Sequence, residues 1–165
     1  MKKSTIIWIV IAVIVVGLII FAISGYNSLV RMEEEVDSAL ANIDTNLQRR
    51  ADLIPNLVNT VKGFASQETE IMNSVTEARA KLAGASTVED KANADNELTS
   101  ALNRLMVVVE NYPDLKSSQN FIQLSDELAG TENRIAVARR DYNQKVQEYN
   151  AQRKKFPTNI LAGMF

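Results

Sequence analysis

An uninterrupted apolar run near the N-terminus constrains this chain more than any other feature. All eighteen residues from 6 to 23 are apolar apart from Gly17. A membrane-spanning helix needs about 20 apolar residues to cross about 30 Å of hydrocarbon. The sequence therefore predicts one transmembrane helix followed by a soluble segment. The positions that mark this span are Ile6, Trp8, Gly17, Phe21 and Ile23.

A cleaved signal peptide is the alternative interpretation of this run. Ala22 and Ser24 stand before Gly25, which gives the small residues that a signal peptidase needs. The run is longer than the usual core of a signal peptide, and this favours an uncleaved anchor. We therefore expect a membrane anchor over residues 1–25, a helical domain over residues 26–156 and an apolar C-terminal tail over residues 157–165.

The charges on either side of the span predict its orientation. Lys2 and Lys3 precede it, whereas Arg31 and the acidic residues from Glu33 to Asp37 follow it. Because positive residues favour the cytoplasmic side, we expect a cytoplasmic N-terminus. The sequence thus predicts a single-pass protein of the inner (cytoplasmic) membrane, whose main domain lies outside the cytoplasm.

Composition disfavours most enzyme chemistry. The chain has no cysteine and no histidine, which excludes disulfides, thiol nucleophiles, Ser-His-Asp triads and imidazole ligands for metals. Outside Lys2 and Lys3, 16 basic residues stand against 20 acidic ones, a balance that disfavours nucleic acid as a partner. We therefore expect no catalytic activity, no cofactor and no small-molecule substrate. A metal site or a glycosidase pair built from carboxylates alone remains a weaker alternative.

Apolar residues recur in steps of three and four beyond the span, which is the pattern of amphipathic helices. Runs that alternate apolar and polar residues are missing from this region, so we expect an all-α domain. The first group of positions is Val36, Leu40, Ile43, Leu47, Ile54, Leu57, Val61, Phe64, Ile71, Val75, Ala78 and Leu82. The later groups are Leu98, Leu102, Leu105, Val109 and Tyr112, then Phe121, Leu128, Ile135, Tyr142, Tyr149 and Phe156.

The length of the first stretch decides between three helices and four. A helix from residue 27 to residue 83 would be about 85 Å long, much longer than the later helices can cover. Gly63 with Ser66 as a new N-cap offers a break, although the seven-residue repeat continues across it. We favour an antiparallel up-and-down bundle of four helices over three, with a kink just before Pro55.

The later helix ends carry their own signals. Ser86 and Glu89 have capping-box spacing and predict the start of a helix. The next helix is expected to end at residues 112–114, and the last long helix to begin near Ser118 and stop at Pro157.

A group of charged residues on two predicted helices is the main candidate for a polar site. Its members are Arg49, Arg50, Asp52, Glu132, Arg134, Arg139, Arg140 and Asp141. One interpretation is a docking patch, since arginine binds carboxylate or phosphate through two parallel hydrogen bonds. The alternative is pairing between helices that fixes their register, with Arg50 at a core position satisfied by Asp141 or a nearby glutamate. We favour the second interpretation.

The C-terminal end of the last long helix is a candidate contact for lipid or for another subunit. Cations there suit a helix C-terminus, and two helices of equal length would return this end to the bilayer. The basic positions are Lys154 and Lys155, and the apolar ones are Phe156, Ile160, Leu161, Met164 and Phe165.

Several segments resemble the LemA family of bacterial membrane proteins. They are residues 26–30 (YNSLV), 49–58 (RRADLIPNLV), 78–82 (ARAKL), 107–116 (VVVENYPDLK), 127–143 (ELAGTENRIAVARRDYN) and 156–165 (FPTNILAGMF). The resemblance implies one N-terminal membrane helix that carries an α-helical bundle. It implies no catalytic residues and leaves the orientation open.

These observations predict an interaction or scaffold module at the cell envelope. Its expected partners are the lipid bilayer and either copies of itself or other membrane proteins. A regulatory or sensory accessory subunit of a membrane complex is the alternative.

Overall fold

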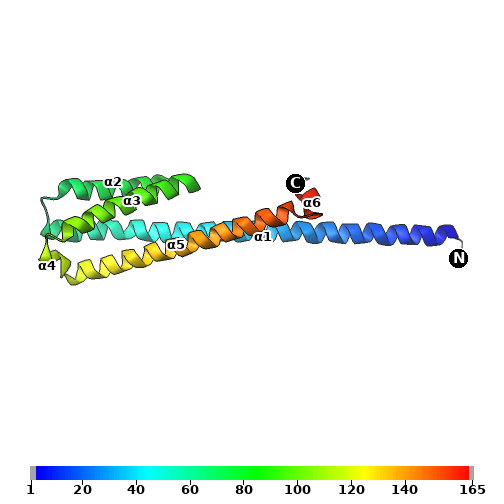
Figure 1. The fold of residues 1–165 in the computed structure, drawn as a ribbon, viewed down its shortest axis with the longest axis horizontal. Coiled ribbons are helices and arrows are strands. Elements are labelled where there is room, and N and C mark those ends of the chain that lie inside the picture. Colours follow the sequence, from blue (N-terminus) through cyan, green and yellow to red (C-terminus); the bar gives the residue numbers. More distant parts are fainter. Residues whose placement is uncertain (1–2, 164–165) are drawn as a thin grey trace. The chain divides into compact units, whose positions relative to one another are not determined.

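The structure, a computed structural model, describes residues 3–163, with the side chains of residues 6–160, 162 and 163. Every regular element in this part of the chain is a helix (Figure 1). The helices are α1 (Lys3–Phe64), α2 (Thr69–Gly84), α3 (Val88–Val109), α4 (Pro113–Lys116), α5 (Gln119–Lys154) and α6 (Thr158–Ala162). The predicted all-α class is therefore confirmed.

The chain forms two compact units. The first, which we call the anchor unit, comprises Met1–Ala41 and Arg139–Phe165. The second, which we call the bundle unit, is the continuous segment Asn42–Ala138. The helices α1 and α5 are both divided between the units, so each of them contributes one part to the anchor unit and one part to the bundle unit.

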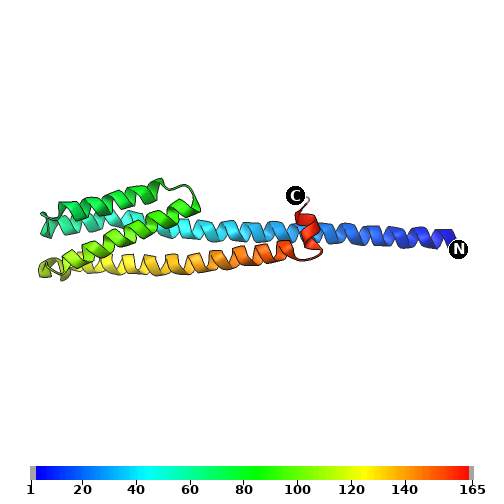
Figure 2. The same ribbon diagram turned by 45° about the horizontal axis from the view of Figure 1, so that its top comes forward.

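The bundle unit is an up-and-down arrangement of four helical segments. The last part of α1, then α2, α3 and the first part of α5 run in alternating directions, and α4 joins α3 to α5 (Figure 2). Because α1 ends at Phe64 and α2 begins at Thr69, the predicted break near Gly63 is confirmed. The four-helix prediction holds, although the seven-residue repeat runs across the break.

The core of the bundle unit is built largely from the predicted apolar stripes, to which Leu115 and Thr131 add positions that were not predicted. Its largest fully buried side chains are Ile54, Leu57, Val61, Val75, Leu98, Leu105, Leu115 and Thr131. Truncating a buried Leu or Ile to Ala typically costs about 2–5 kcal/mol, so this layer supplies much of the stability of the unit.

Eight stripe positions depart from the prediction: Phe64 and Phe156 are exposed, and Val36, Leu40, Ile71, Tyr112, Tyr142 and Tyr149 are half-buried. Of these, Phe64, Tyr112 and Phe156 lie at helix ends. Phe64 is 49% exposed, and Ala65 takes the buried place instead. Tyr112 is half-buried, and Phe156 is 80% exposed beyond the end of α5. A periodic pattern places a side chain against the core only while the helix continues, and here the helix stops.

The helix starts are close to the predicted ones but use different residues. Thr87, not Ser86, is the N-cap of α3, and its Oγ1 accepts a hydrogen bond from the Asp90 amide at 3.0 Å. The N-cap of α2 is Glu68 rather than Ser66, and it makes no side-chain cap. Ser118 caps α5 as expected, because the Phe121 amide donates to its Oγ at 3.3 Å.

Pro55 lies inside α1, which continues through it. A proline has no amide hydrogen, so the carbonyl four residues earlier, on Ala51, loses its usual helical donor. Arg79 of α2 donates from Nε to this Ala51 oxygen at 3.0 Å. The proline therefore creates an acceptor that ties α1 to α2.

In the anchor unit, the apolar segment of α1 is exposed along its whole length. It is the one helix segment in the described part of the chain that is long and apolar enough to cross a membrane, and none of its residues is buried. Beyond it, Leu29 and Ala39 are buried, and Lys145 of α5 donates to Glu35 of α1 at 2.9 Å. Both views place α6 beside α1 (Figures 1 and 2).

Candidate functional site

A buried charged centre connects three helices of the bundle unit. Arg50 of α1 is 2% exposed, and its Nη1 lies 2.7 Å from Oδ1 of Asp95 on α3, which is 3% exposed. Its Nη2 lies 3.7 Å from Oε2 of Glu132 on α5, an exposed side chain. Arg50 therefore has one close, buried partner, Asp95, and one more distant, solvent-exposed partner, Glu132.

The partners of Arg50 include an expected glutamate, Glu132, but its closest partner was not expected. The sequence pointed to Asp141 or a nearby glutamate, whereas the structure pairs Arg50 most closely with Asp95, 45 residues away along the chain. Glu132 was in the predicted group, but Asp95 was not. A buried Asp in the interior of an otherwise apolar stripe was the available signal, because such a carboxylate needs a cation.

The Arg50 centre has one unsatisfied group. Its Nε is buried without a hydrogen-bond partner, as is Oγ of Ser125. A buried ion pair gives little net stability over an apolar replacement, but removing one partner is strongly destabilising. The geometry therefore suits a centre that enforces one mutual register of α1, α3 and α5.

The remaining predicted residues do not gather into one site. Arg49, Asp52 and Arg134 are exposed on the bundle unit, and Asp52 accepts a hydrogen bond from Gln48 at 2.9 Å. The anchor unit contains Arg139, Arg140 and Asp141. The eight side chains are thus divided between the two units, and neither unit by itself contains a docking patch formed by all of them.

An open hollow surrounds Arg134 on the bundle unit. It has a volume of about 370 Å³ and lies between α1 and α5. Asn42, Asn46 and Asn133 supply amides, and Val137 is 60% exposed at its edge. The hollow thus combines polar side chains with an apolar part formed by Val137 and Ala138.

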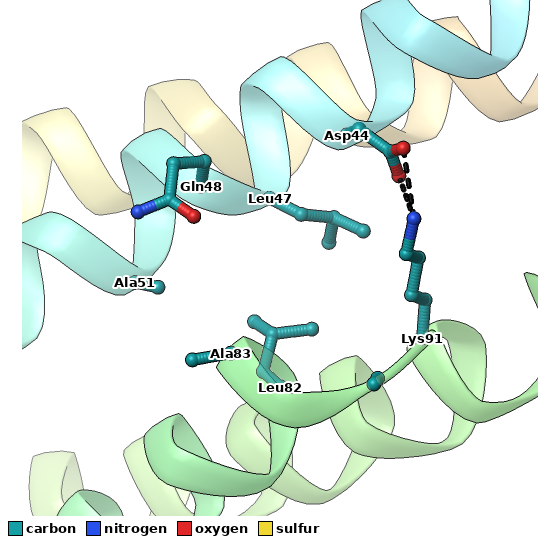
Figure 3. A pocket seen from close by; sticks show the side chains of 8 residues that line it. Asp44, Leu47, Gln48, Ala51, Leu82, Ala83 and Lys91 are labelled. Atoms are coloured by element: carbon teal, nitrogen blue, oxygen red, sulfur yellow. Dashed lines mark hydrogen bonds and ion pairs between the residues drawn. The ribbon is translucent and has the colours of Figure 1, made fainter. Parts of the chain in front are cut away.

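A smaller cavity of about 140 Å³ lies where α1 faces the end of α2 and the start of α3. Leu47 and Leu82 point into it, and Lys91 donates to both carboxylate oxygens of Asp44 at 2.8 Å along one side (Figure 3). The sequence analysis placed both leucines in the stripes but missed this ion pair. The volume of this cavity suits one or two side chains rather than a small-molecule substrate.

The anchor unit contains a third hollow, just past the apolar segment. It has a volume of about 270 Å³ and is lined by α1, α5 and α6. Glu33, Tyr26, Tyr149 and Arg153 supply its polar groups. Leu29, Val30 and Ala162 supply its apolar ones. This groove has no signal in the sequence, because it forms only when α6 folds back beside α1 (Figures 1 and 2).

The predicted C-terminal contact residues lie close to this groove in the chain. Lys154 and Lys155 are exposed, Phe156 is 80% exposed and Ile160 is 55% exposed. The side chain of Leu161 and all of Met164 and Phe165 lie outside the described residues. The contact with lipid or with another subunit stays a prediction.

Two titratable groups have pKa values shifted by hydrogen bonds to glutamates. The hydroxyl of Tyr112 donates to Glu68 at 2.9 Å, and this bond raises the pKa of Tyr112, with smaller contributions from burial and from the Glu68 charge. The bond from Lys145 to Glu35 likewise raises the pKa of Lys145. Both shifts hold the protonated form. Within the described residues, no group of three or more acidic side chains is close enough to hold a metal ion.

Comparison with known sequences decides the family. The LemA family profile matches residues 39–165 of the chain. The chain belongs to the LemA family.

Named relatives agree with this assignment. Magnetosome proteins MamQ 1 and MamQ 2 of Paramagnetospirillum magneticum are each 32% identical over 174 residues, which cover 90% of this chain and 64% of theirs. Protein LemA of Metamycoplasma hominis is 30% identical over 156 residues, covering 91% of this chain and 69% of its own. The chain thus spans slightly less than two thirds of the MamQ relatives. The family match and the exposed apolar helix together indicate a membrane-associated helical protein.

The two most specific segments of this LemA-family chain have structural roles. Residues 107–116 turn α3 into α4, with Leu115 fully buried and Tyr112 bonded to Glu68. Residues 127–143 contribute the buried Thr131 and Ile135 to the core and Glu132 to the Arg50 centre. Both segments thus supply residues to the core or to the polar contacts of the bundle unit.

Proposed function

We propose that this protein is a membrane-anchored interaction or scaffold module that assembles with copies of itself and carries no catalytic activity. The observation that carries the proposal is the dual use of α1. Its residues 6–23 are apolar and wholly exposed, and its residues 43–61 supply the core of the bundle unit. The apolar segment and the first segment of the bundle unit thus belong to one helix, Lys3–Phe64.

The surface of the bundle unit supports contact rather than chemistry. Its hollows are small or open, and its buried charges already pair with each other. Exposed apolar side chains stand on its outer faces, among them Val107 at 69% and Val137 at 60%. Isolated apolar side chains on helix faces are suited to lateral packing against another helix.

The natural absence of cysteine makes a clean test of self-assembly available. Single Val107→Cys and Val137→Cys variants report contacts only at the introduced position, because the chain has no other thiol. We expect disulfide-linked dimers from at least one of them in native membranes under mild oxidation. A Glu148→Cys variant, which places the thiol on the anchor unit, compares the two units. Monomers from all three variants, with a monomeric mass in lipid nanodiscs, would contradict the scaffold proposal.

Orientation is tested separately. We propose that the bundle unit lies outside the cytoplasm, because Lys2 and Lys3 precede the span. Reporters that are active on only one side of the membrane, fused after Phe165, measure this directly. Activity of a cytoplasmic reporter would reverse the orientation without affecting the anchor.

A further inference from the structure

The groove of the anchor unit lies at a defined depth relative to the span. Tyr26 follows the last span residue, Ile23, by three residues, and Glu33 follows it by ten. At 1.5 Å per residue these positions lie about 5 Å and 15 Å beyond the hydrocarbon. The headgroup layer is about 5–8 Å thick on each side. If residues 6–23 span the bilayer, Tyr26 therefore lies within the headgroup layer, and the backbone of Glu33 lies about 7–10 Å beyond it. Side chains of a helix lean towards its N-terminus, which brings the carboxylate of Glu33 back towards the headgroups.

The groove presents one charge of each sign. Arg153 comes from α5 and Glu33 from α1, and both side chains are exposed. Guanidinium groups bind phosphate through two parallel, charge-assisted hydrogen bonds. A glutamate accepts hydrogen bonds from a primary ammonium, and aromatic rings such as those of Tyr26 and Tyr149 attract cations. The two charges together match a ligand that carries both a phosphate and an ammonium.

We propose that this groove binds the headgroup of a zwitterionic phospholipid with a primary ammonium, of the phosphatidylethanolamine type. The phosphate pairs with Arg153, and the ammonium pairs with Glu33. This inference rests on the proposed membrane anchoring. It adds a lipid selectivity that anchoring alone does not require.

The size of the groove agrees with a headgroup. Its volume of about 270 Å³ lies below the roughly 300–1,000 Å³ of pockets for drug-sized ligands, so a whole lipid does not fit. The acyl chains would lie along the apolar segment of α1. The exposed Lys154 and Lys155 do not line the groove, and they attract anionic lipids without selecting one headgroup.

The test uses the full chain in bilayers of three lipids with matched acyl chains: phosphatidylethanolamine, phosphatidylcholine and phosphatidylglycerol in equal amounts. Native mass spectrometry after transfer to mild detergent counts the lipids that each protein retains. We expect the unmodified chain to retain phosphatidylethanolamine about tenfold over the other two. The choline lipid has a phosphate but cannot donate to Glu33, and the glycerol lipid has no cation.

Two variants separate the two halves of the site. Arg153→Gln should lower retention of phosphatidylethanolamine about tenfold, because it removes the phosphate contact. Glu33→Gln should abolish the preference over phosphatidylglycerol while some phosphate binding remains. Glu34→Gln, outside the groove on α1, is a matched control and should retain lipid as the unmodified chain does. Lys154→Gln removes a predicted lipid contact outside the groove, and should leave the preference for phosphatidylethanolamine over phosphatidylcholine unchanged. All four positions are exposed, and circular dichroism checks that the helices persist.

The outcomes are distinct. Equal retention of the three lipids, a preference for phosphatidylglycerol, or unchanged retention in both groove variants would overturn the inference. Such a result in a protein that stays in the membrane and forms disulfide-linked dimers would leave the proposed function standing. A protein that leaves the membrane on alkaline extraction would instead overturn the anchoring itself.

Discussion

Helix α1 carries two apolar segments that differ in what surrounds them. Residues 6–23 are apolar on all sides, and none is buried. Between residues 43 and 61 the apolar residues form a single stripe, and Ile43, Leu47, Ile54, Leu57 and Val61 are all at most 6% exposed. A helix surrounded by lipid needs apolar side chains all round, whereas a helix in a bundle needs them on one face only. The periodicity, more than the apolar content, thus indicates the environment of each segment.

The two units also differ in where their ion pairs lie, in the core or at the surface. The bundle unit encloses the Arg50–Asp95 pair in its core, where the low dielectric makes an unpaired charge costly. The anchor unit keeps its Lys145–Glu35 pair at the surface, where water screens it. Loss of one partner should therefore matter greatly in the first unit and little in the second.

The largest expected effect comes from charging the two apolar segments in turn. Ile11→Lys with Val15→Lys should prevent membrane insertion, since each lysine at the centre of a span costs about 2.5–3.5 kcal/mol. Alkaline extraction followed by fractionation measures the loss. The matched variant Ile54→Lys should unfold the bundle unit yet leave the protein in the membrane. Equal behaviour of the two proteins would remove the distinction between the segments.

The second effect tests the buried charge. Asp95→Ala should destabilise the bundle unit by about 3–5 kcal/mol, because it leaves Arg50 buried without its close partner. Chemical unfolding of the full chain in detergent, followed by circular dichroism, measures this change. The double variant Arg50→Met, Asp95→Leu should recover most of the loss. A double variant as unstable as the single one would show that the pair itself is needed.

A third, smaller effect distinguishes the observed cap from the predicted one. Thr87→Ala should cost about 1 kcal/mol, because it removes the acceptor for the Asp90 amide. Ser86→Ala, at the neighbouring position, should change stability by less than about 0.5 kcal/mol. The same unfolding measurement compares them. A larger loss at Ser86 would restore the cap expected from the sequence.

The smallest effect concerns the surface pair of the anchor unit. The bond to Glu35 raises the pKa of Lys145 in the folded protein, so this pair stabilises the fold below the ordinary lysine pKa of 10.5. The contribution is lost as the pH rises through the raised folded pKa. Glu35→Gln should lower the pKa of Lys145, which a pH titration of its side-chain NMR signals detects.

The control for this titration lies one residue away. Glu34→Gln removes the same charge from the same turn of α1, but Glu34 does not accept the hydrogen bond of Lys145. The pKa of Lys145 should therefore fall less than in Glu35→Gln. Equal shifts in the two variants would mean that the net charge of this turn, rather than the bond, sets the pKa.

Local patterns predicted the helices well and their ends less well. The apolar stripes placed Ile54, Leu98 and Leu105 in the core correctly, because helical periodicity alone fixes which face is apolar. The cap shifted from Ser86 to Thr87 because either hydroxyl can accept the amide bond, and packing decides between neighbours. Helix lengths correctly favoured a break near Gly63, although the seven-residue repeat continues across it and by itself indicated an unbroken helix.

The candidate sites were harder to predict because they depend on contacts distant in sequence. Arg50 and Asp95 each stand as a charge within an apolar stripe, but no local pattern pairs them, because they lie 45 residues apart along the chain. The groove beside the span needs α6 to fold back beside α1, and no periodic pattern encodes that turn. Both features follow from how helices dock, which a single helix does not determine.

The sequence by itself determined which segment of α1 is apolar on all sides and which presents one apolar stripe to a bundle core, because each environment demands its own spacing of apolar residues along a helix. Only the tertiary structure decided which acidic side chain meets Arg50 and which side chains surround the groove. The physical reason is that a buried charge or a pocket wall depends on the relative rotation and sliding of packed helices. The relative position of the packed helices depends on how many side chains fit together, so it cannot be read from any single residue.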